Sequence, residues 1–210
     1  MKKRKMSLLK KIIPDQQVGS KTGATSSFDL KNKFSAIKLF NIAKYRLLDV
    51  NHWYDICGRK GAEFQLTDDK GNILDSAIPD IGNLIRIKLP APPNAKGDGY
   101  DWVRIEKFEN LKDLSKDEDL YGFRVRPVSN PNNRSGESAH FYTNDATSTF
   151  LIYRRGSKVF AMERGRNELP NASGSFLNKI RNFLVAIPAM LGFSKPQWKS
   201  LVEGILEHNN

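Results

Sequence analysis

The sequence predicts an α+β fold in which a curved antiparallel sheet of six to seven strands packs on a long carboxy-terminal helix, with two short helices near the amino terminus. Two changes in hydrophobic period lead to this prediction. Apolar residues recur at helical spacing over residues 35–57, alternate with polar residues over residues 63–163, and return to helical spacing from residue 175. Residues 28–210 are therefore expected to form a single α+β domain.

Residues 1–27 are basic, and an amphipathic helix is expected after them. Residues 1–27 are rich in Lys, Gly and Ser, so they are expected to form a disordered basic arm. A short strand is expected over residues 28–34, followed by a helix that Ser35 caps by accepting a hydrogen bond from a free amide of the first turn. The apolar stripe of this helix comprises Ala36, Leu39, Phe40, Ala43 and Leu47. A second helical piece is expected from Val50 to Cys57.

Alternation of apolar and polar residues predicts the strands of the sheet. They are expected over residues 63–67, 84–89, 100–106, 123–126, 140–143, 149–154 and 158–163, with residues 155–157 as the turn between the last two. One face of the predicted sheet is apolar. The other face carries Arg86, Lys88, Arg104, Arg124 and Arg126, together with Trp102, and is expected to meet solvent.

The carboxy-terminal region is expected to contain two helices. The first begins at Ser175, is kinked by Pro188 and ends at Gly192, because proline lacks the amide that continues the hydrogen-bond ladder. Ser194 and Gln197 then fit a capping box, in which each side chain satisfies a free amide of the other's residue. An extra terminal helix is therefore expected over residues 195–208.

Charge and cysteine content exclude several classes of protein. Residues 1–60 hold 14 Lys or Arg and four Asp, a balance of +10 out of the total +11, so the body of the domain does not carry the basic excess of a nucleic-acid-binding surface. Cys57 is the single cysteine, which excludes an intramolecular disulfide and favours a cytoplasmic location. No apolar run approaches the roughly 20 residues that cross a bilayer, and no signal peptide is expected.

Three local sequences resemble the START-like, or SRPBCC, helix-grip superfamily. They are Phe-Asp-Leu-Lys-Asn-Lys-Phe-Ser-Ala at 28–36, Asp-Val-Asn-His-Trp at 49–53 and Ile-Gly-Asn-Leu-Ile-Arg-Ile at 81–87. The resemblance covers residues 28–192, except that this superfamily ends in one uninterrupted helix where Pro188 and Gly192 interrupt the pattern. It implies a sheet curled around the long helix and a cavity for a lipid, sterol, polyketide or similar ligand. No catalytic residues are common to the superfamily.

Candidate ligand-binding residues come from the densest polar cluster and from aromatic side chains. The cluster spans residues 163–171, where Arg166, Asn167 and Glu168 could line the mouth of a pocket; the alternative is a solvated junction between strand and helix. The aromatic candidates for the lining are Trp53, Trp102, His140 and Tyr142. We therefore expect a noncatalytic binding protein for an apolar or amphipathic small molecule.

Catalytic, metal and cofactor sites are not expected. His52, His140 and His208 do not pair with each other or with Cys57 at the spacing of zinc ligands, and the sequence holds no nucleophile elbow or phosphate loop. An enzyme with acids and bases inside the cavity remains open. The alternative function is an interaction protein that meets an anionic membrane surface through residues 1–13, at the membrane periphery, or nucleic acid through the arginine-bearing sheet face.

Overall fold

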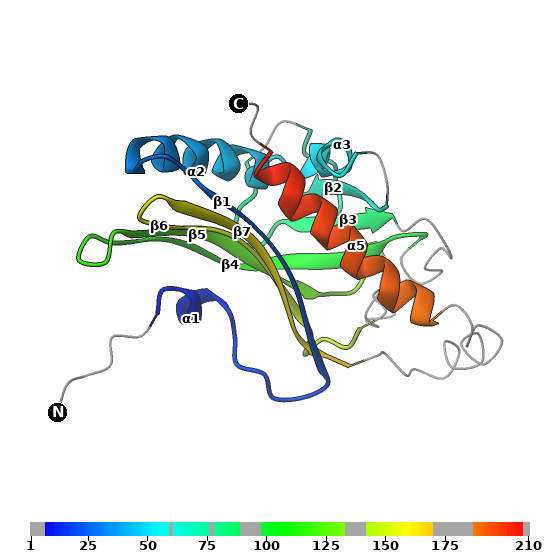
Figure 1. The fold of residues 1–210 in the computed structure, drawn as a ribbon. Coiled ribbons are helices and arrows are strands. Elements are labelled where there is room, and N and C mark those ends of the chain that lie inside the picture. Colours follow the sequence, from blue (N-terminus) through cyan, green and yellow to red (C-terminus); the bar gives the residue numbers. More distant parts are fainter. Residues whose placement is uncertain are drawn as a thin grey trace.

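The computed structural model describes residues 7–58, 61–75, 78–88, 98–132, 142–169 and 187–207 of the 210-residue chain, with side chains in the last range from residue 196 onward. Seven strands form one antiparallel sheet in the order β1-β7-β6-β5-β4-β3-β2, so the first strand lies beside the last (Figure 1). They are β1 (Ser20–Asp29), β2 (Glu63–Thr67), β3 (Leu84–Lys88), β4 (Asp101–Asp113), β5 (Glu118–Pro127), β6 (Thr147–Arg155) and β7 (Lys158–Glu168). The predicted antiparallel sheet is confirmed.

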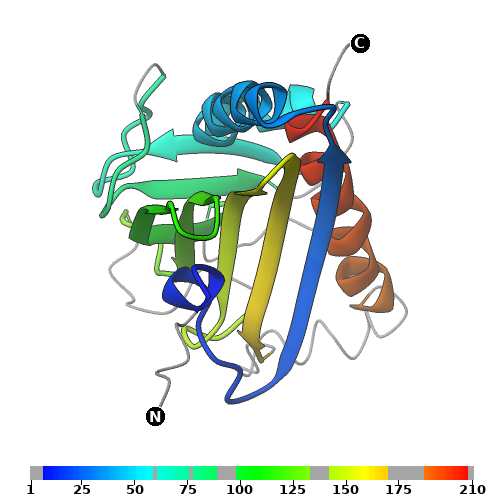
Figure 2. The same ribbon diagram turned by 60° about the vertical axis from the view of Figure 1, so that its left-hand side comes forward.

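Helices cover both faces of this sheet (Figures 1 and 2). The face that packs against α2 (Lys33–Leu48), η1 (Val50–His52), α3 (Trp53–Ile56) and α5 (Ile187–Ile205) is called the inner face, and the face that packs against α1 (Leu9–Ile12) is the outer face. Since successive strand residues point to opposite faces, the inner face is formed by alternate residues. Its core members include Val103, Ile105, Phe123, Val125, Phe150, Ile152, Val159 and Ala161. Among the described helices, none is long and apolar enough to cross a bilayer.

Helix α2 begins two residues before the predicted cap. Asn32 is the N-cap, and its side-chain oxygen accepts a hydrogen bond from the amide of Ser35 at 2.8 Å. An asparagine in extended backbone satisfies a free amide of the first turn as well as a serine does, so the position of the cap differs from the prediction while its chemistry does not. All five residues of the predicted apolar stripe are buried, and they fix the helix on the inner face.

The carboxy-terminal helix differs from the prediction of a break and an extra helix over 195–208. Helix α5 runs from Ile187 to Ile205 through Gly192, with Pro196 inside it. Pro188 is the second described residue of α5, and the residues before Ile187 lie outside the described part. Burial of Leu201, Val202 and Ile205 against the core holds the helix in place despite the proline. The predicted segment 175–186 lies outside the described residues.

Residues 7–27 are structured, so the expectation of a disordered arm is wrong for this part of it. Strand β1 pairs with β7 from Ser20 opposite Glu168 to Asp29 opposite Lys158. Its small polar residues have a weak preference for strands, and the strand forms because β1 pairs with the edge of β7. Upstream, Leu8 and Ile12 of the α1 segment are 5% and 0% exposed against Leu120, Leu151, Tyr153 and Met162 of the outer face. Residues 1–6 lie outside the described part.

Candidate functional site

One end of the inner face is filled by aromatic rings. The ring of Trp53 lies 5.3 Å from that of Phe64 and 4.9 Å from that of Phe150, and Trp198 of α5 lies 5.2 Å from Phe150 on the other side. The Trp53 indole donates hydrogen bonds to the main-chain oxygens of residues 46 and 47 at the end of α2. Because Trp53 is only 1% exposed, this end is a solid core.

A buried acid adjoins this aromatic core on the inner face. Glu163 lies in β7 opposite Phe150 of β6 and opposite Ala24 of β1, so its carboxyl group shares a row with apolar residues. It is 0% exposed, and neither carboxylate oxygen has a hydrogen-bond partner among the described residues. Burial and, after it, the charge of Glu168 raise the pKa of Glu163, whereas Arg164 and Arg166 lower it, and the net result is a pKa of about 8. The carboxyl group is therefore largely protonated at neutral pH.

Glu168 is brought onto the same face by an irregularity in the β1–β7 ladder. The register shifts between Ser20 and Thr22, and Asn167 adopts a left-handed φ of 56°. As a result the Glu168 carboxylate accepts a hydrogen bond from the Thr22 hydroxyl at 2.9 Å. A Cβ atom at Gly165 would lie 2.1 Å from the Glu168 carboxylate, so only glycine leaves room for this arrangement.

Tyr142 completes the group of inner-face polar residues, which we call the carboxyl cluster: Thr22, Tyr142, Glu163 and Glu168. Burial, followed by the charges of Glu168 and Glu163, raises the pKa of the Tyr142 hydroxyl above its ordinary value. Beside the cluster lies a small cavity of about 20 Å³, lined by Val103, Val125, Pro127, Tyr142, Ala146, Thr147, Ser148 and Glu168. This volume holds about one water molecule.

The structure separates the residues that the sequence predicted as a site. Glu168 and Tyr142 lie in the carboxyl cluster, whereas Trp53 is in the aromatic core. Trp102 lies on the outer face with Leu84, 3% exposed. His140 lies outside the described residues.

The two other predicted residues hold neighbouring chain in place. Arg166 donates hydrogen bonds to the main-chain oxygens of Thr22 and Gly165, at 3.3 and 2.6 Å. Asn167 accepts hydrogen bonds from the amides of Gln17 and Val18 and thereby fixes the segment before β1. Neither side chain belongs to the carboxyl cluster.

Glu163 was missed as a site residue although its strand pattern contained a signal. Val159, Ala161 and Glu163 alternate along one strand, so an acid occupies a position that the pattern assigns to the apolar face. A charged residue is almost never buried without a partner. The participation of Thr22 could not be found in the sequence, because residues 1–27 were expected to be disordered.

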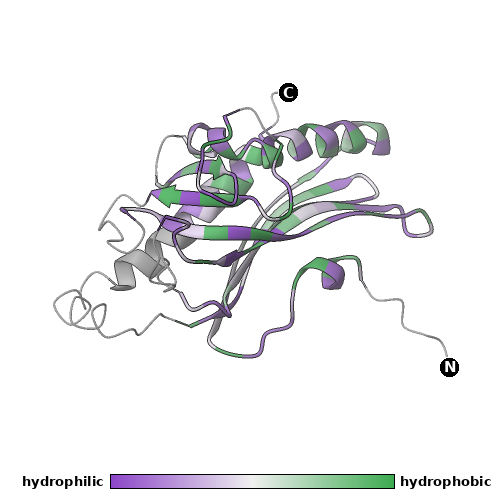
Figure 3. Ribbon diagram, turned by 180° about the vertical axis from the view of Figure 1, so that it is seen from behind, coloured by the Kyte–Doolittle hydropathy of each residue, from purple (hydrophilic) through white to green (hydrophobic). Residues whose placement is uncertain are grey.

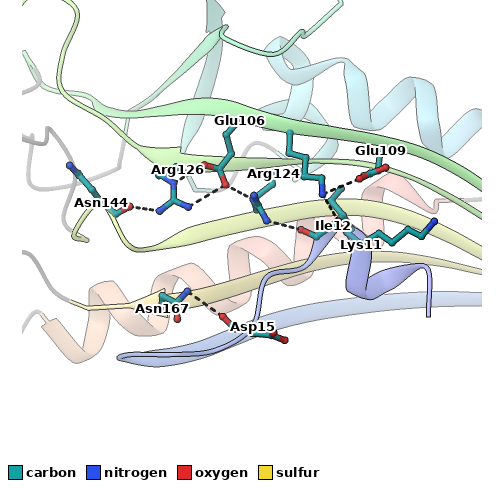
Figure 4. Close-up of polar contacts among 10 residues, drawn as sticks. Lys11, Ile12, Asp15, Glu106, Glu109, Arg124, Arg126, Asn144 and Asn167 are labelled. Carbon is teal, nitrogen blue, oxygen red and sulfur yellow. Dashed lines mark hydrogen bonds and ion pairs between the residues drawn. The ribbon is translucent and has the colours of Figure 1, made fainter. Parts of the chain in front are cut away.

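The outer face does not present a solvated row of arginines, which corrects the expectation for two of them. Arg124 and Arg126 both pair with Glu106 (Figure 4). Arg124 also donates a hydrogen bond to the main-chain oxygen of Ile12, and Arg126 donates one to the main-chain oxygen of Asn144. Burial raises the pKa of Glu106, but the two guanidinium groups outweigh it and the pKa lies below its ordinary value. With α1 on this face and Trp102 buried, a stacking platform for nucleic acid bases is absent from its described part.

The side chains that could bind a metal ion are scattered. Within the described ranges, no three His, Cys, Asp or Glu side chains are grouped in a way that could hold such an ion. Cys57 is buried, and burial raises the pKa of its thiol to about 11, which makes it a poor nucleophile.

No protein-family model matches this sequence, and no curated protein matches it. Among solved structures, norcoclaurine synthase from Thalictrum flavum is similar at 9% identity and a TM-score of 0.35, over 93% of this chain and 100% of that one. Ginseng major latex-like protein 151 from Panax ginseng is similar at 10% identity and a TM-score of 0.36, over 82% and 98%. A protein from Thermus thermophilus reaches 13% identity and a TM-score of 0.40, over 89% and 94%. Similarities of this size transfer no ligand or reaction to this chain.

Proposed function

We propose that this chain is a noncatalytic binding protein for an amphipathic small molecule, held between the inner face and α5 with a hydrogen-bond-donating group at Glu163. The observation that supports the proposal is the fully buried Glu163 carboxyl group, whose two oxygens have no partner among the described residues. An unpartnered buried polar group costs about 1–3 kcal/mol. A ligand that donates a hydrogen bond there recovers that free energy.

The carboxyl cluster defines the polar part of the ligand. The charge of Glu168 disfavours a phosphate or carboxylate, and the Glu163 carboxyl group, protonated at neutral pH, offers no positive charge to hold one. The nearby arginines do not offset this, because Arg164 and Arg166 bind main-chain oxygens of β1 and β7. A hydroxyl group or a protonated amine on an apolar body fits the cluster.

The size of the cavity requires movement on binding. A pocket for an ordinary small-molecule ligand has a volume of about 300 Å³ or more, whereas the cavity at Glu168 has about 20 Å³. The adjoining aromatic core at Trp53 leaves no room either. In this proposal α5 therefore moves away from the inner face to admit the ligand.

The test is native mass spectrometry of freshly purified protein, followed by denaturation and identification of any released molecule. The proposal expects a released compound with an apolar body and a hydroxyl or amine group, and lower occupancy in Glu163→Leu than in wild type. Glu63→Gln is the matched control, because Glu63 is exposed in β2. Empty wild-type protein that also shows no thermal shift with long-chain alcohols or amines would overturn the proposal.

A second candidate function is proton transfer on a bound substrate. The observation that favours it is the pKa of about 8 at Glu163, because an acid that titrates near the operating pH is suited to general acid–base catalysis. The two functions are distinguished by the chemical structure of the released compound, determined by NMR after prolonged incubation with the protein, because proton transfer alone leaves its mass unchanged. An unchanged compound supports binding alone, and a product that forms in wild type but not in Glu163→Gln supports catalysis.

A further inference from the structure

Helix α2 has a second apolar stripe, on the side away from the sheet. Phe34, Ile37 and Tyr45 are 79%, 38% and 75% exposed, whereas the stripe on the opposite side of the helix is buried in the core. At 100° per residue, these three side chains lie on one side of α2 together with Lys38 and Asn41. Figure 3 shows both hydrophilic and hydrophobic bands along the ribbon of α2.

The charge of this helix has one sign. From Leu30 to Leu48 the chain contains five basic residues, Lys31, Lys33, Lys38, Lys44 and Arg46, and no acid. Some of them have structural partners: Arg46 binds main-chain oxygens at the end of α5, and Lys44 lies over the Tyr121 ring. Lys31 and Lys38 are exposed beside the apolar stripe.

The turn between β4 and β5 lies beside the start of α2. Lys33 pairs with Asp117 at 2.7 Å, which places the turn beside the start of α2, and both lie at the same end of the molecule in Figure 1. Leu114, in that turn, is 81% exposed. Isolated exposed apolar residues are ordinary, but three of them along one side of a basic helix form a surface.

We propose that the outer side of α2, with Leu114, docks on an anionic lipid bilayer. Aromatic and aliphatic side chains on one side of a basic helix are the pattern of a helix that lies in the membrane interface. The lysines supply attraction to anionic headgroups, and the inner stripe keeps α2 attached to the sheet while it docks. The α1 segment is a poorer candidate, since its Leu8 and Ile12 are already buried against the outer face. This proposal is independent of ligand binding at Glu163.

The test is co-sedimentation of the full chain with vesicles of phosphatidylcholine alone or of an equimolar mixture with phosphatidylserine. Binding is expected only to the mixed vesicles and should weaken as salt is added, because salt screens exposed charges. The double variant Phe34→Ala/Tyr45→Ala and the charge-reversed variant Lys31→Glu/Lys38→Glu should each bind about tenfold more weakly. Their thermal unfolding should match wild type, since all four side chains are exposed.

Matched controls lie at the far end of β1, roughly 30 Å away along the strand. Val18→Ala removes another exposed apolar side chain and Lys21→Glu reverses another exposed charge, so neither should change binding. Replacement of Lys2, Lys3, Arg4 and Lys5 by serine separates the contribution of the amino terminus. Wild-type affinity in both α2 variants, together with loss of binding in the amino-terminal variant, overturns the proposal. Absence of wild-type binding to mixed vesicles at low salt overturns it as well.

Discussion

Glu163 lies directly opposite Phe150 in the β6–β7 ladder, so a carboxyl group and a phenyl ring occupy neighbouring positions in one row of the inner face. The next row contains Gly165 opposite Ser148, and Gly165 in turn lies opposite Thr22 of β1. Polar and apolar rows therefore meet at Glu163.

Replacing Glu163 by glutamine should stabilise the protein at alkaline pH. The pKa of Glu163 is raised from 4.5 to about 8 in the folded chain, so the folded state holds a proton that the unfolded state has lost between these values. Wild-type stability should therefore fall as the pH rises through this window, by up to about 5 kcal/mol. The glutamine in Glu163→Gln cannot ionise, so the free energy of unfolding of this variant should exceed that of wild type by an amount that grows from pH 5 to pH 9.

The measurement for this prediction is urea unfolding across that pH range. Glu63→Gln is the control, because Glu63 is exposed and should leave the pH dependence unchanged. A pH profile of Glu163→Gln that runs parallel to the wild-type profile would show that Glu163 is ionised normally in the folded protein.

Gly165→Ala should displace Glu168. The added methyl group would lie 2.1 Å from the Glu168 carboxylate and 2.3 Å from the Thr22 hydroxyl, and overpacking of this kind costs about 1–3 kcal/mol. In a Glu168→Ala background the same substitution should cost less, because the obstructing carboxylate is gone. A double-mutant cycle by chemical unfolding measures the difference; purely additive effects would contradict the proposed contact.

Ile12→Ala should release the α1 segment from the outer face. Ile12 is 0% exposed against Leu151 and Met162, and its truncation removes apolar burial worth about 2–4 kcal/mol. Trypsin should then cut faster after Lys10 and Lys11, which a docked segment protects. Val18→Ala is the control with an exposed side chain, and equal cleavage rates in both variants and wild type would show that α1 is not docked in solution.

Gly204→Ala should weaken the packing of α5 on α3. A Cβ atom at this position would lie 2.3 Å from the carbonyl oxygen of Ile56, and backbone cannot yield as a flexible side chain can. We expect a loss of about 1–3 kcal/mol in thermal or chemical unfolding. Since alanine favours helix by about 1 kcal/mol over glycine, an increase in stability would mean that the two helices are farther apart than this contact requires.

The sequence was sufficient to predict the inner face because its signal is local and repetitive. Ile85, Val103, Val125 and Ile152 follow strict alternation, and all of them are buried in the predicted sheet. The stripe of α2 follows helical spacing in the same way. Such periods are imposed by backbone geometry, so one sequence is enough to recognise them.

Other features depend on partners that are distant in the sequence. Only Phe28 and Asp29 at the end of β1 fall within the short strand predicted over residues 28–34, because the small polar residues before them become a strand only through pairing with β7. For the same reason the candidate site was identified only in part. Glu168 was found in a polar cluster, but its contact with Thr22 joins residues 146 positions apart and depends on a bulge. The capping pattern near Pro196 predicts the start of a separate terminal helix. In the structure α5 continues through Pro196, because its later residues pack against the core.

The pairing of β1 with β7 also sets the order in which the fold can be completed. Ser20 and Glu168 are bonded neighbours separated by 148 positions, so on the ribosome β1 waits until nearly the whole chain has emerged before it gains its partner. The β6–β7 hairpin, joined by a short turn at Gly156, needs no such wait. Closing a loop of this length costs chain entropy, so we expect β1 to join the sheet after the β6–β7 hairpin has formed. Until then the edge of β7 stays open to pairing with a second copy of the chain.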